Sequence, residues 1–326
     1  MSEAGEERSG RAAGGEIANR AGFVALVGRP NAGKSTLLNA LVGEHLAAVS
    51  HKAQTTRHRI PGFLTDDSTQ FVFVDTPGFL DPAYALQQSM LDTALSALDG
   101  VDVVCWLVDH DEPSEREEEL LRDLAGRRLN VDCTSGTTAG DTLPLILLLT
   151  KSDQVPVAKL DARERTWGKL GVWAGRFRLS AVTRDGLPEF LAGLRERLPE
   201  QPFFYDPEDL TDLNLRFLAA EMVREACYEE LGAELPYSVH VEVTEWREAT
   251  SEEDKTLIRA TIYVERESQK GIVIGKGGAK LGEIGRRSRV SIEWMLGAPV
   301  FLELRVKVRP KWSRRELDLQ HFGYRR

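Results

Sequence analysis

The residues best suited to chemistry lie near the N-terminus, where residues 28–35 read GRPNAGKS. This spacing of two glycines before Lys-Ser lets backbone N–H groups curl around phosphate oxygens without interference from a Cβ atom. Lys34 would bring its charge to the β and γ phosphates, and the Ser35 hydroxyl would bind Mg²⁺. The stretch therefore predicts a nucleotide phosphate site. Its other contacts are expected from Asn31, Ala32, Gly33 and Thr36.

The flanking sequence offers the strand and the helix that such a loop requires. Residues 23–27 are apolar, which favours a buried parallel strand. Residues 35–41 continue as an amphipathic helix, and Gly43 follows its expected end. The positive end of that helix would point at the same phosphates, so the local context agrees with the motif.

A second polar group of residues, 75–78, follows the apolar run 71–74. Ligands of open α/β sheets lie at the carboxyl ends of strands, so Asp75 is expected to hold Mg²⁺ through water and the Gly78 N–H to touch a γ phosphate. Thr56 or Thr55, between the two motifs, would supply a second hydroxyl to Mg²⁺. Such a loop would order with a triphosphate and relax after hydrolysis. The predicted catalytic groups are Lys34, Thr56 and Gly78.

A third apolar run, residues 145–149, leads to Thr150, Lys151 and Asp153, where a base-reading loop belongs in this architecture. The Asp153 carboxylate can accept hydrogen bonds from N1 and N2 of guanine, which adenine cannot supply, and an unpaired carboxylate would be costly. The sequence therefore predicts GTP rather than ATP. Loop N–H groups at Ser180 and Ala181 are weaker candidates for contact with the guanine O6.

Taken in order, these motifs resemble those of the translation-factor-like GTPases over residues 20–200. Thr150 departs from the family, which has an asparagine that braces the phosphate loop. Phe79 also departs, because Ras-like members carry a water-orienting glutamine there. Similar enzymes bind K⁺ through the asparagine that Asn31 matches, so the resemblance implies K⁺-stimulated, intrinsically slow hydrolysis. Arg57 is a candidate arginine finger, although a solvated or RNA-facing side chain is the preferred interpretation.

A change of composition separates this region from the rest of the chain. Residues 199–207 read PEQPFFYDP, which breaks any helix and marks a linker. Residues 211–231 have apolar side chains at helical spacing, and residues 237–246, 258–264 and 301–308 alternate as strands do. A helix, two strands and a final strand are therefore expected beyond the linker.

Before the last of these strands, residues 271–284 read GIVIGKGGAKLGEI. The whole order of helix, two strands, glycine loop, helix and strand resembles a type II KH domain. In that family the glycine loop, here residues 275–278, lets the backbone lie against the sugar-phosphates of about four nucleotides. A glycine-rich turn between core elements is the alternative. Residues 272–274 are expected in the core in both cases, and Trp312 is expected to cap the core rather than stack on a base. The implied RNA contacts are Gly271, Ile274, Gly275, Lys276, Gly277, Gly278, Lys280, Arg286 and Arg287.

Composition sets outer limits on the function. From residue 270 onward, 14 basic residues accompany 5 acidic ones, a net charge of +9, which leaves −18 for residues 1–269 of a total of −9. The basic end would bind a polyanion. The alternative is a solvated basic face without a ligand. Three scattered cysteines favour a reducing compartment without zinc or disulfides. Apolar runs too short for a bilayer, and no hydrophobic signal core, predict a cytoplasmic protein without a transmembrane segment.

The predicted organisation is an α/β P-loop GTPase domain, with a mostly parallel sheet and helices on both faces, followed by an α+β type II KH domain. The expected boundaries are a disordered tail (1–20), the GTPase domain (21–198), a linker (199–209) and the KH domain with a basic tail (210–326). Residues 130–141, rich in Thr, Ser, Asp and Gly, read as an inserted surface loop.

This combination resembles the Era family of bacterial ribosome-assembly GTPases. The resemblance implies GTP or GDP with Mg²⁺ as ligands, binding of small-subunit ribosomal RNA near its 3′ end, assembly of the 30S ribosomal subunit precursor and a monomeric protein. Peripheral contact with the inner membrane face is left open. Two alternatives stay open as well: an RNA-binding protein that uses its nucleotide only as a sensed ligand, and an EngA-like ribosome GTPase, which a single phosphate loop disfavours.

Overall fold

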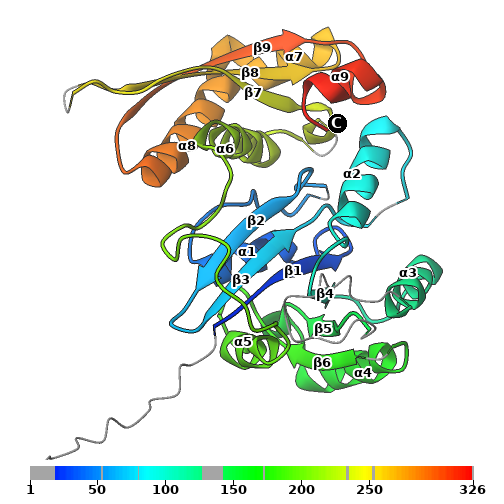
Figure 1. Ribbon diagram of the computed structural model, residues 1–326. Coiled ribbons are helices and arrows are strands. Elements are labelled where there is room, and N and C mark those ends of the chain that lie inside the picture. The colour runs from blue at the N-terminus through cyan, green and yellow to red at the C-terminus, as the bar shows by residue number, and fades with distance from the viewer. Residues whose placement is uncertain are drawn as a thin grey trace, which may run out of the picture.

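The computed structural model describes residues 19–324 except 53, 80, 127–141, 172, 233–234 and 252–253. The predicted N-terminal tail (up to residue 18) and the insertion at 130–141 lie outside these residues. The described chain forms an N-terminal unit around a six-stranded sheet and a C-terminal unit around a three-stranded sheet (Figure 1).

The N-terminal sheet has the strand order β2-β3-β1-β4-β5-β6. Only β2 and β3 pair antiparallel, and every other pair is parallel. The first strand begins at Arg20, within the segment predicted as a tail. The strands are β1 (Arg20–Gly28), β2 (Ile60–Thr65), β3 (Thr69–Asp75), β4 (Val103–Val108), β5 (Leu145–Leu149) and β6 (Trp173–Arg178).

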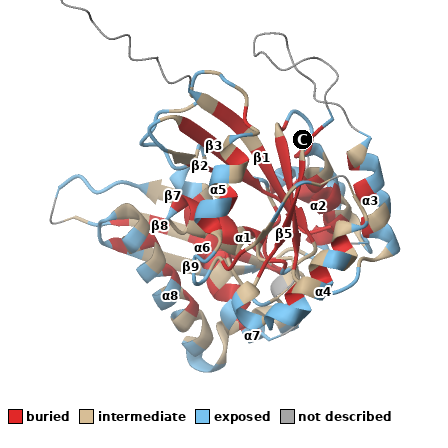
Figure 2. Ribbon diagram, turned by 90° about the horizontal axis from the view of Figure 1, so that it is seen from below, coloured by how far each residue is buried: buried red, intermediate tan, exposed pale blue. Residues whose placement is uncertain are grey.

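Helices cover both faces of this sheet, as predicted. One apolar cluster joins α1 and α5 to one face, and a second joins α2, α3 and α4 to the other. Strands β3, β4 and β5 are buried along their whole length, and Figure 2 shows buried strands between more exposed helices. The carboxyl ends of the parallel strands therefore form one edge where ligands can collect. The helices are α1 (Lys34–Val42), α2 (Ala85–Ser96), α3 (Glu115–Ala125), α4 (Val157–Gly168) and α5 (Leu187–Arg195).

The predicted linker and the two residues that follow it pack against the edge strand β2. The Phe63 N–H donates to the Leu210 carbonyl at 2.8 Å, and the Thr211 hydroxyl donates to the Pro61 carbonyl at 2.7 Å. The ring of Tyr205 stacks on Phe63 with centroids 3.9 Å apart. Because an edge strand carries backbone groups without a strand partner, a chain laid along it gains hydrogen bonds. The linker thus fixes where the C-terminal unit begins.

The C-terminal unit confirms the predicted order of helix, two strands, glycine loop, helix and strand, with one further helix, not predicted, before the glycine loop. Its sheet has the order β7-β8-β9, with β7 antiparallel and β9 parallel to β8. Helices α6 and α8 contribute to its apolar core. The elements are α6 (Leu215–Glu230), β7 (His240–Arg247), β8 (Thr256–Val264), α7 (Glu267–Ile274), α8 (Ala279–Leu296), β9 (Val300–Val308) and α9 (Glu316–His321).

The expectation that residues 272–274 all lie in the core is wrong. They form the last turn of α7, in which only Val273 is buried, whereas Ile272 is 50% exposed and Ile274 is half-buried. Successive side chains of a helix point about 100° apart, so three in a row cannot all face one sheet. Ile272 is therefore a surface residue of the helical turn that precedes the glycine loop.

The segment after β9 returns to the N-terminal unit. Trp312, Phe322 and Tyr324 form a buried cluster with Leu86 and Met90 of α2. The indole of Trp312 is fully buried and donates to the Ser238 carbonyl at 2.9 Å, which confirms the capping role and excludes stacking on a base. The two units therefore share an apolar core.

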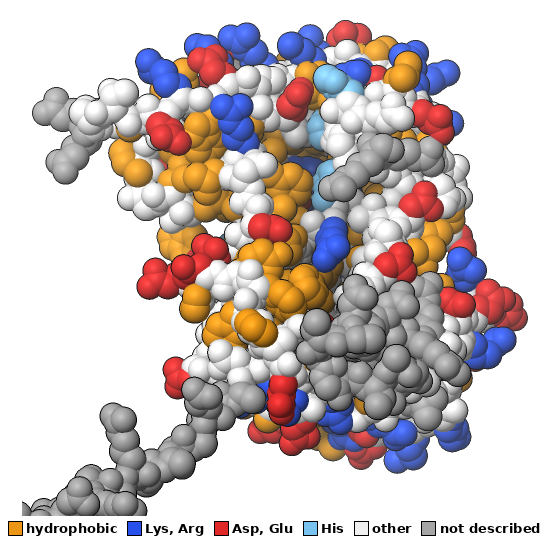
Figure 3. Space-filling view, in the orientation of Figure 1, with side chains coloured by type: hydrophobic (Ala, Val, Ile, Leu, Met, Phe, Trp, Pro, Cys, Tyr) orange, Lys and Arg blue, Asp and Glu red, His pale blue; other side chains and the backbone are white. Residues whose placement is uncertain are grey.

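Three composition-based expectations can be compared with the described residues. Cys105 and Cys227 are buried free thiols, while Cys133 lies outside these residues. Within the described part of the chain, no helix combines the length and apolar character of a membrane span. Figure 3 shows Lys and Arg side chains along the upper edge of the molecule, over β9 and α7, where the charge count placed the basic end.

Candidate nucleotide site and glycine loop

The phosphate loop connects β1 to α1, and its glycines are required by the backbone. Gly28 has φ +149°, and a Cβ there would lie 2.5 Å from the Leu107 carbonyl oxygen. Gly33 has φ +93° and precedes the first turn of α1. Lys34 is buried under the loop, where its Nζ donates to the Arg29 carbonyl at 2.8 Å. Burial lowers the pKa of Lys34 to about 8, although the charge of Asp75 opposes the shift.

Three predicted Mg²⁺ ligands meet at this loop. The Ser35 hydroxyl lies 2.6 Å from Asp75 Oδ2 and 2.6 Å from the Thr56 hydroxyl, which is itself 3.2 Å from Asp75 Oδ2. Burial raises the pKa of Asp75 to about 6, while the charge of Lys34 and the hydroxyl hydrogen bonds oppose that shift. Hydroxyl and carboxylate oxygens suit Mg²⁺. Of the two candidate threonines, Thr56 lies at this cluster, whereas the Thr55 hydroxyl donates to the Lys52 carbonyl.

Gly78 lies directly against the phosphate loop. A Cβ at this position would come within 2.4 Å of the Pro30 backbone nitrogen, so no other residue fits without movement of one loop. The next residue, Phe79, is buried and stacks on Trp106 with ring centroids 5.6 Å apart. Its side chain therefore faces the core and cannot orient an attacking water.

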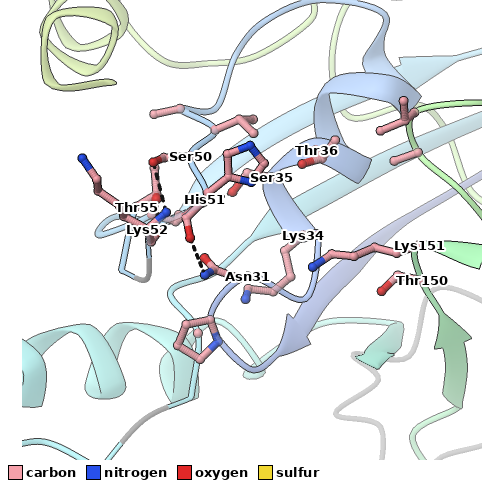
Figure 4. A pocket seen from close by; sticks show the side chains of 18 of the residues that line it. Asn31, Lys34, Ser35, Thr36, Ser50, His51, Lys52, Thr55, Thr150 and Lys151 are labelled. Atoms are coloured by element: carbon pink, nitrogen blue, oxygen red, sulfur yellow. Dashed lines mark hydrogen bonds between the residues drawn. The ribbon is translucent and has the colours of Figure 1, made fainter. Parts of the chain in front are cut away.

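The predicted base-reading residues line the same cavity, which has a volume of about 830 Å³ (Figure 4). The Thr150 hydroxyl donates to the Ala32 carbonyl at 2.8 Å, so the threonine braces the phosphate loop without an amide. The Lys151 side chain extends along the cavity beside Lys34 (Figure 4). The carboxylate of Asp153 is exposed at the cavity wall. The other predicted lining residues are Asn31, Gly33, Thr36, Ser180 and Ala181.

One acidic partner of this loop was missed by the sequence analysis. Asp109 Oδ2 lies 2.7 Å from the Lys151 ammonium. Burial alone would raise the pKa of Asp109, but hydrogen bonds from His110 and Lys151 lower it to about 2. Asp109 follows directly after β4, so the rule that ligands gather at strand ends could have identified it. The ion pair holds the Lys151 ammonium beside Asp109 at the cavity.

The cavity also reaches the C-terminal unit, which the sequence did not predict. Glu225, Tyr228 and Glu229 of α6 line it together with the segment between α1 and β2, residues 43–59, here called the α1–β2 segment. The Lys52 ammonium of this segment donates to the carbonyls of Tyr228 and Leu231 at the end of α6. A cation is favourable at the C-terminal end of a helix. The nucleotide cavity is therefore built from both units.

The interpretation of Arg57 as an arginine finger is wrong, and so is the solvated or RNA-facing alternative. Its side chain is 2% exposed and does not line the cavity. The guanidinium donates to the carbonyl of Val239 at 2.7 Å, to the carbonyl of Tyr237 at 3.1 Å and to the Tyr228 hydroxyl at 2.9 Å. The acceptors belong to the C-terminal unit, about 180 residues away in sequence, so no local pattern could reveal them.

The glycine loop between α7 and α8 is open to solvent. Gly275, Gly277 and Gly278 have φ of +72°, +60° and +82°, a backbone region that side chains rarely adopt. A Cβ at Gly275 would lie 2.7 Å from Lys280 Cβ, whereas a Cβ at Gly277 or Gly278 would meet nothing within 4 Å. Lys276 is exposed within the loop. A sugar-phosphate backbone can therefore approach this loop closely.

The two arginines predicted to face RNA differ in their surroundings. Arg286 is exposed and pairs only with Glu283, in the same helix, among the contacts described for it. Arg287 bonds to Glu229 and Glu230 of α6 as well as to Glu283. Exposed ion pairs of this kind contribute little to stability, so Arg286 can exchange its partner for a phosphate. Arg287 instead links α8 to α6.

Comparisons with known proteins agree with both halves of the chain. A family model described as "50S ribosome-binding GTPase" matches residues 23–139, and a KH domain model matches residues 234–313. GTPase Era of Geobacter metallireducens is 41% identical over 308 residues, covering 94% of this chain and 98% of the relative. GTPase Era of Leuconostoc citreum is 40% identical over 306 residues, covering 94% and 96%.

Two solved structures are similar over the same length. A crystal structure of Era in complex with MgGDPNP and nucleotides 1506–1542 of 16S ribosomal RNA has a TM-score of 0.83 at 35% identity, covering 94% of this chain and 99% of the other. A variant of Aquifex aeolicus Era bound to GDP.AlF4⁻ has a TM-score of 0.81 at 33% identity, with the same coverage.

Proposed function

The chain belongs to the Era family of GTPases, and from this premise we propose that it is a GTP-controlled switch that binds ribosomal RNA. In this proposal residues 21–198 bind and hydrolyse GTP, residues 199–209 link the units, and residues 210–326 bind RNA. One observation carries the proposal. A single chain contains an enclosed phosphate loop in one unit and an open glycine loop in the other, and the two units share an apolar core.

The N-terminal unit would act mainly by positioning and charge. Mg²⁺, held by Ser35, Thr56 and Asp75, would neutralise charge that develops on the phosphates. Lys34 would bind the β and γ phosphates, and the Gly78 N–H would contact the γ phosphate that only GTP carries. Thr150 braces the loop beneath the phosphates through its hydroxyl. Because Phe79 faces the core, intrinsic hydrolysis should be slow.

A potassium ion is the finer part of the cofactor proposal. The Asn31 side chain reaches the α1–β2 segment, where its amide lies 2.9 Å from the His51 carbonyl oxygen (Figure 4). A side-chain oxygen of Asn31 and a carbonyl of this segment are ligands that K⁺ accepts. Hydrolysis should therefore be faster in KCl than in NaCl of equal ionic strength, and equal rates would contradict the potassium site.

The C-terminal unit would bind small-subunit ribosomal RNA near its 3′ end in the 30S ribosomal subunit precursor. The backbone of Gly275, Gly277 and Gly278 would contact the RNA chain, with Lys276, Lys280 and Arg286 supplying charge. Gly271, Ile274 and Arg287 complete the proposed footprint, although Arg287 must first leave its carboxylates. The family relative solved with 16S ribosomal RNA supports this choice of partner. A monomer is proposed, since one chain contains both sites.

One experiment separates this proposal from a nucleotide-sensing protein that does not hydrolyse GTP. Single-turnover GTP hydrolysis is measured with and without an RNA that carries nucleotides 1506–1542 of 16S ribosomal RNA, the fragment bound by the relative. The proposal predicts Mg²⁺-dependent release of phosphate. GTP binding without phosphate release under both conditions would favour the sensor. The match to the Era family covers 94% of the chain and favours that family over the EngA-like alternative.

A further inference from the structure

Two consecutive residues of the α1–β2 segment serve different units. The Thr56 hydroxyl lies 2.6 Å from Ser35 at the Mg²⁺ site, while the Arg57 guanidinium is buried against the C-terminal unit. One peptide bond joins the two. The Arg57 anchor therefore restrains backbone that is directly bonded to the residue carrying the Thr56 hydroxyl.

The Arg57 anchor is costly to break, because its buried guanidinium would leave hydrogen-bond partners behind. Its guanidinium bonds to two backbone carbonyls and to the Tyr228 hydroxyl, and it lies 5.9 Å from the ring centroids of Tyr228 and Trp312. Removing a buried charge from its hydrogen-bond partners is costly for both. The docked arrangement of the two units therefore holds this part of the segment in one position.

Tyr324 connects this anchor to the helix that follows Gly78. Its ring stacks on His58 with centroids 4.6 Å apart, and its hydroxyl lies 3.5 Å from Arg57 and 3.0 Å from His240 Nδ1. The Ser89 hydroxyl of α2 donates to its carbonyl. The residue thus touches the segment that carries Thr56, the helix beyond Gly78, and the C-terminal sheet.

We propose that Arg57 is a positioning residue for GTP hydrolysis, which holds Thr56 at the Mg²⁺ site through the docked C-terminal unit, with Tyr324 as its second support. The inference rests on the proposed function and adds that the RNA-binding unit completes the hydrolytic site. Since GDP lacks the γ phosphate, its binding does not depend on Thr56. The base-reading loop makes no described contact with Arg57, so guanine recognition is unaffected.

The test compares Arg57→Gln with the wild-type full-length protein and with Arg59→Gln. Arg59 is an exposed arginine of the same segment, which makes it a matched control. Arg57→Gln should lower the single-turnover rate about ten- to a hundredfold, as expected for a misplaced catalytic group. It should also raise the Mg²⁺ concentration needed for half-maximal hydrolysis, while the Kd for GDP stays within about twofold. Arg59→Gln should match the wild type.

Conservative variants guard against a general folding defect. Arg57→Lys should recover part of the rate, because an ammonium can still donate to carbonyls, and Tyr324→Phe should give a smaller loss in the same direction. Equal loss of hydrolysis and GDP binding in Arg57→Gln, or an unchanged rate and Mg²⁺ dependence, would overturn the inference. A wild-type protein without any hydrolysis would instead overturn the proposed function, so the two failures are distinguishable.

Discussion

The two glycine loops use the same backbone freedom in opposite surroundings. A Cβ at Gly28 of the phosphate loop would lie 2.5 Å from the Leu107 carbonyl oxygen, and a Cβ at Gly78, which lies against this loop, would clash with Pro30. In the loop before α8, Gly277 and Gly278 have nothing within 4 Å of a Cβ. We therefore propose that the first site holds a small ligand and that the second loop is open to a polymer. Substitutions at the glycines of the first site should therefore distort the site itself. Substitutions at the open glycines of the second loop should block the approach of its ligand.

The largest effect is expected from Lys34→Ala. This change removes the buried cation beside the phosphates, so GTP affinity should fall about a hundredfold or more. RNA affinity without nucleotide should stay unchanged, because the glycine loop belongs to the other unit. Equilibrium titration with a fluorescent GTP analogue measures the effect, with Lys169→Ala on the exposed end of α4 as control. If Lys34→Ala kept the GTP affinity of the wild type, the phosphate loop would not be the nucleotide site.

Gly278→Asp should produce the reverse pattern. The position is open and Asp tolerates left-handed backbone, so the fold should survive, while a carboxylate facing phosphates should lower RNA affinity by about tenfold or more. Gly297→Asp is the matched control, because Gly297 ends the same helix with φ +62° and equal free space. Filter binding measures RNA, and the fluorescent analogue measures GTP. Equal RNA affinity in both variants would show that the open loop is not the RNA site.

Acidification to pH 5 should lower the affinity of the nucleotide site about tenfold relative to that of the RNA site. Burial holds the pKa of Asp75 at about 6, so below that pH a proton competes with Mg²⁺ for the carboxylate. Mg²⁺-dependent GTP affinity should fall about tenfold for each pH unit below 6 and be restored above it. Calorimetry at pH 7.5, 6 and 5 checks this, with Asp75→Asn expected to abolish the dependence. A flat profile for the wild type would contradict the role of Asp75.

The smallest effect tests the brace under the phosphate loop. Thr150→Val keeps the shape but removes the hydroxyl that bonds to the Ala32 carbonyl, so GDP affinity should fall about five- to tenfold. Thr150→Asn should bind GDP about as well as the wild type, since the brace already exists. If Thr150→Asn gained far more affinity for GDP than Thr150→Val lost, the Thr150 hydroxyl would not substitute for an amide.

Local sequence was sufficient for the ligand positions but not for the contacts between units. Lys34, Ser35 and Asp75 are positioned by strand ends and by the loop itself, so their spacing predicted them. Arg57 could not be understood locally, because its acceptors at Tyr237 and Val239 become neighbours only when the units dock.

Burial on the second unit was harder to predict for a related reason. Ile272 was placed in the core because an apolar run reads alike in a strand and a helix, and only the helical geometry of α7 exposes it. Trp312 was predicted correctly as a cap, yet the cluster that it caps includes Leu86 and Met90 of the other unit. The type of a residue indicates whether its side chain tends to be buried. The fold determines which residues it is buried against.

The most direct test of the account is the RNA affinity of the full-length protein in three nucleotide states. Binding of the fragment carrying nucleotides 1506–1542 of 16S ribosomal RNA is measured with a non-hydrolysable GTP analogue, with GDP and without nucleotide, for the wild type and Arg57→Gln. The account predicts tighter binding with the GTP analogue in the wild type, and a smaller difference in Arg57→Gln because coupling is reciprocal. Equal affinity in all three states of the wild type would contradict it.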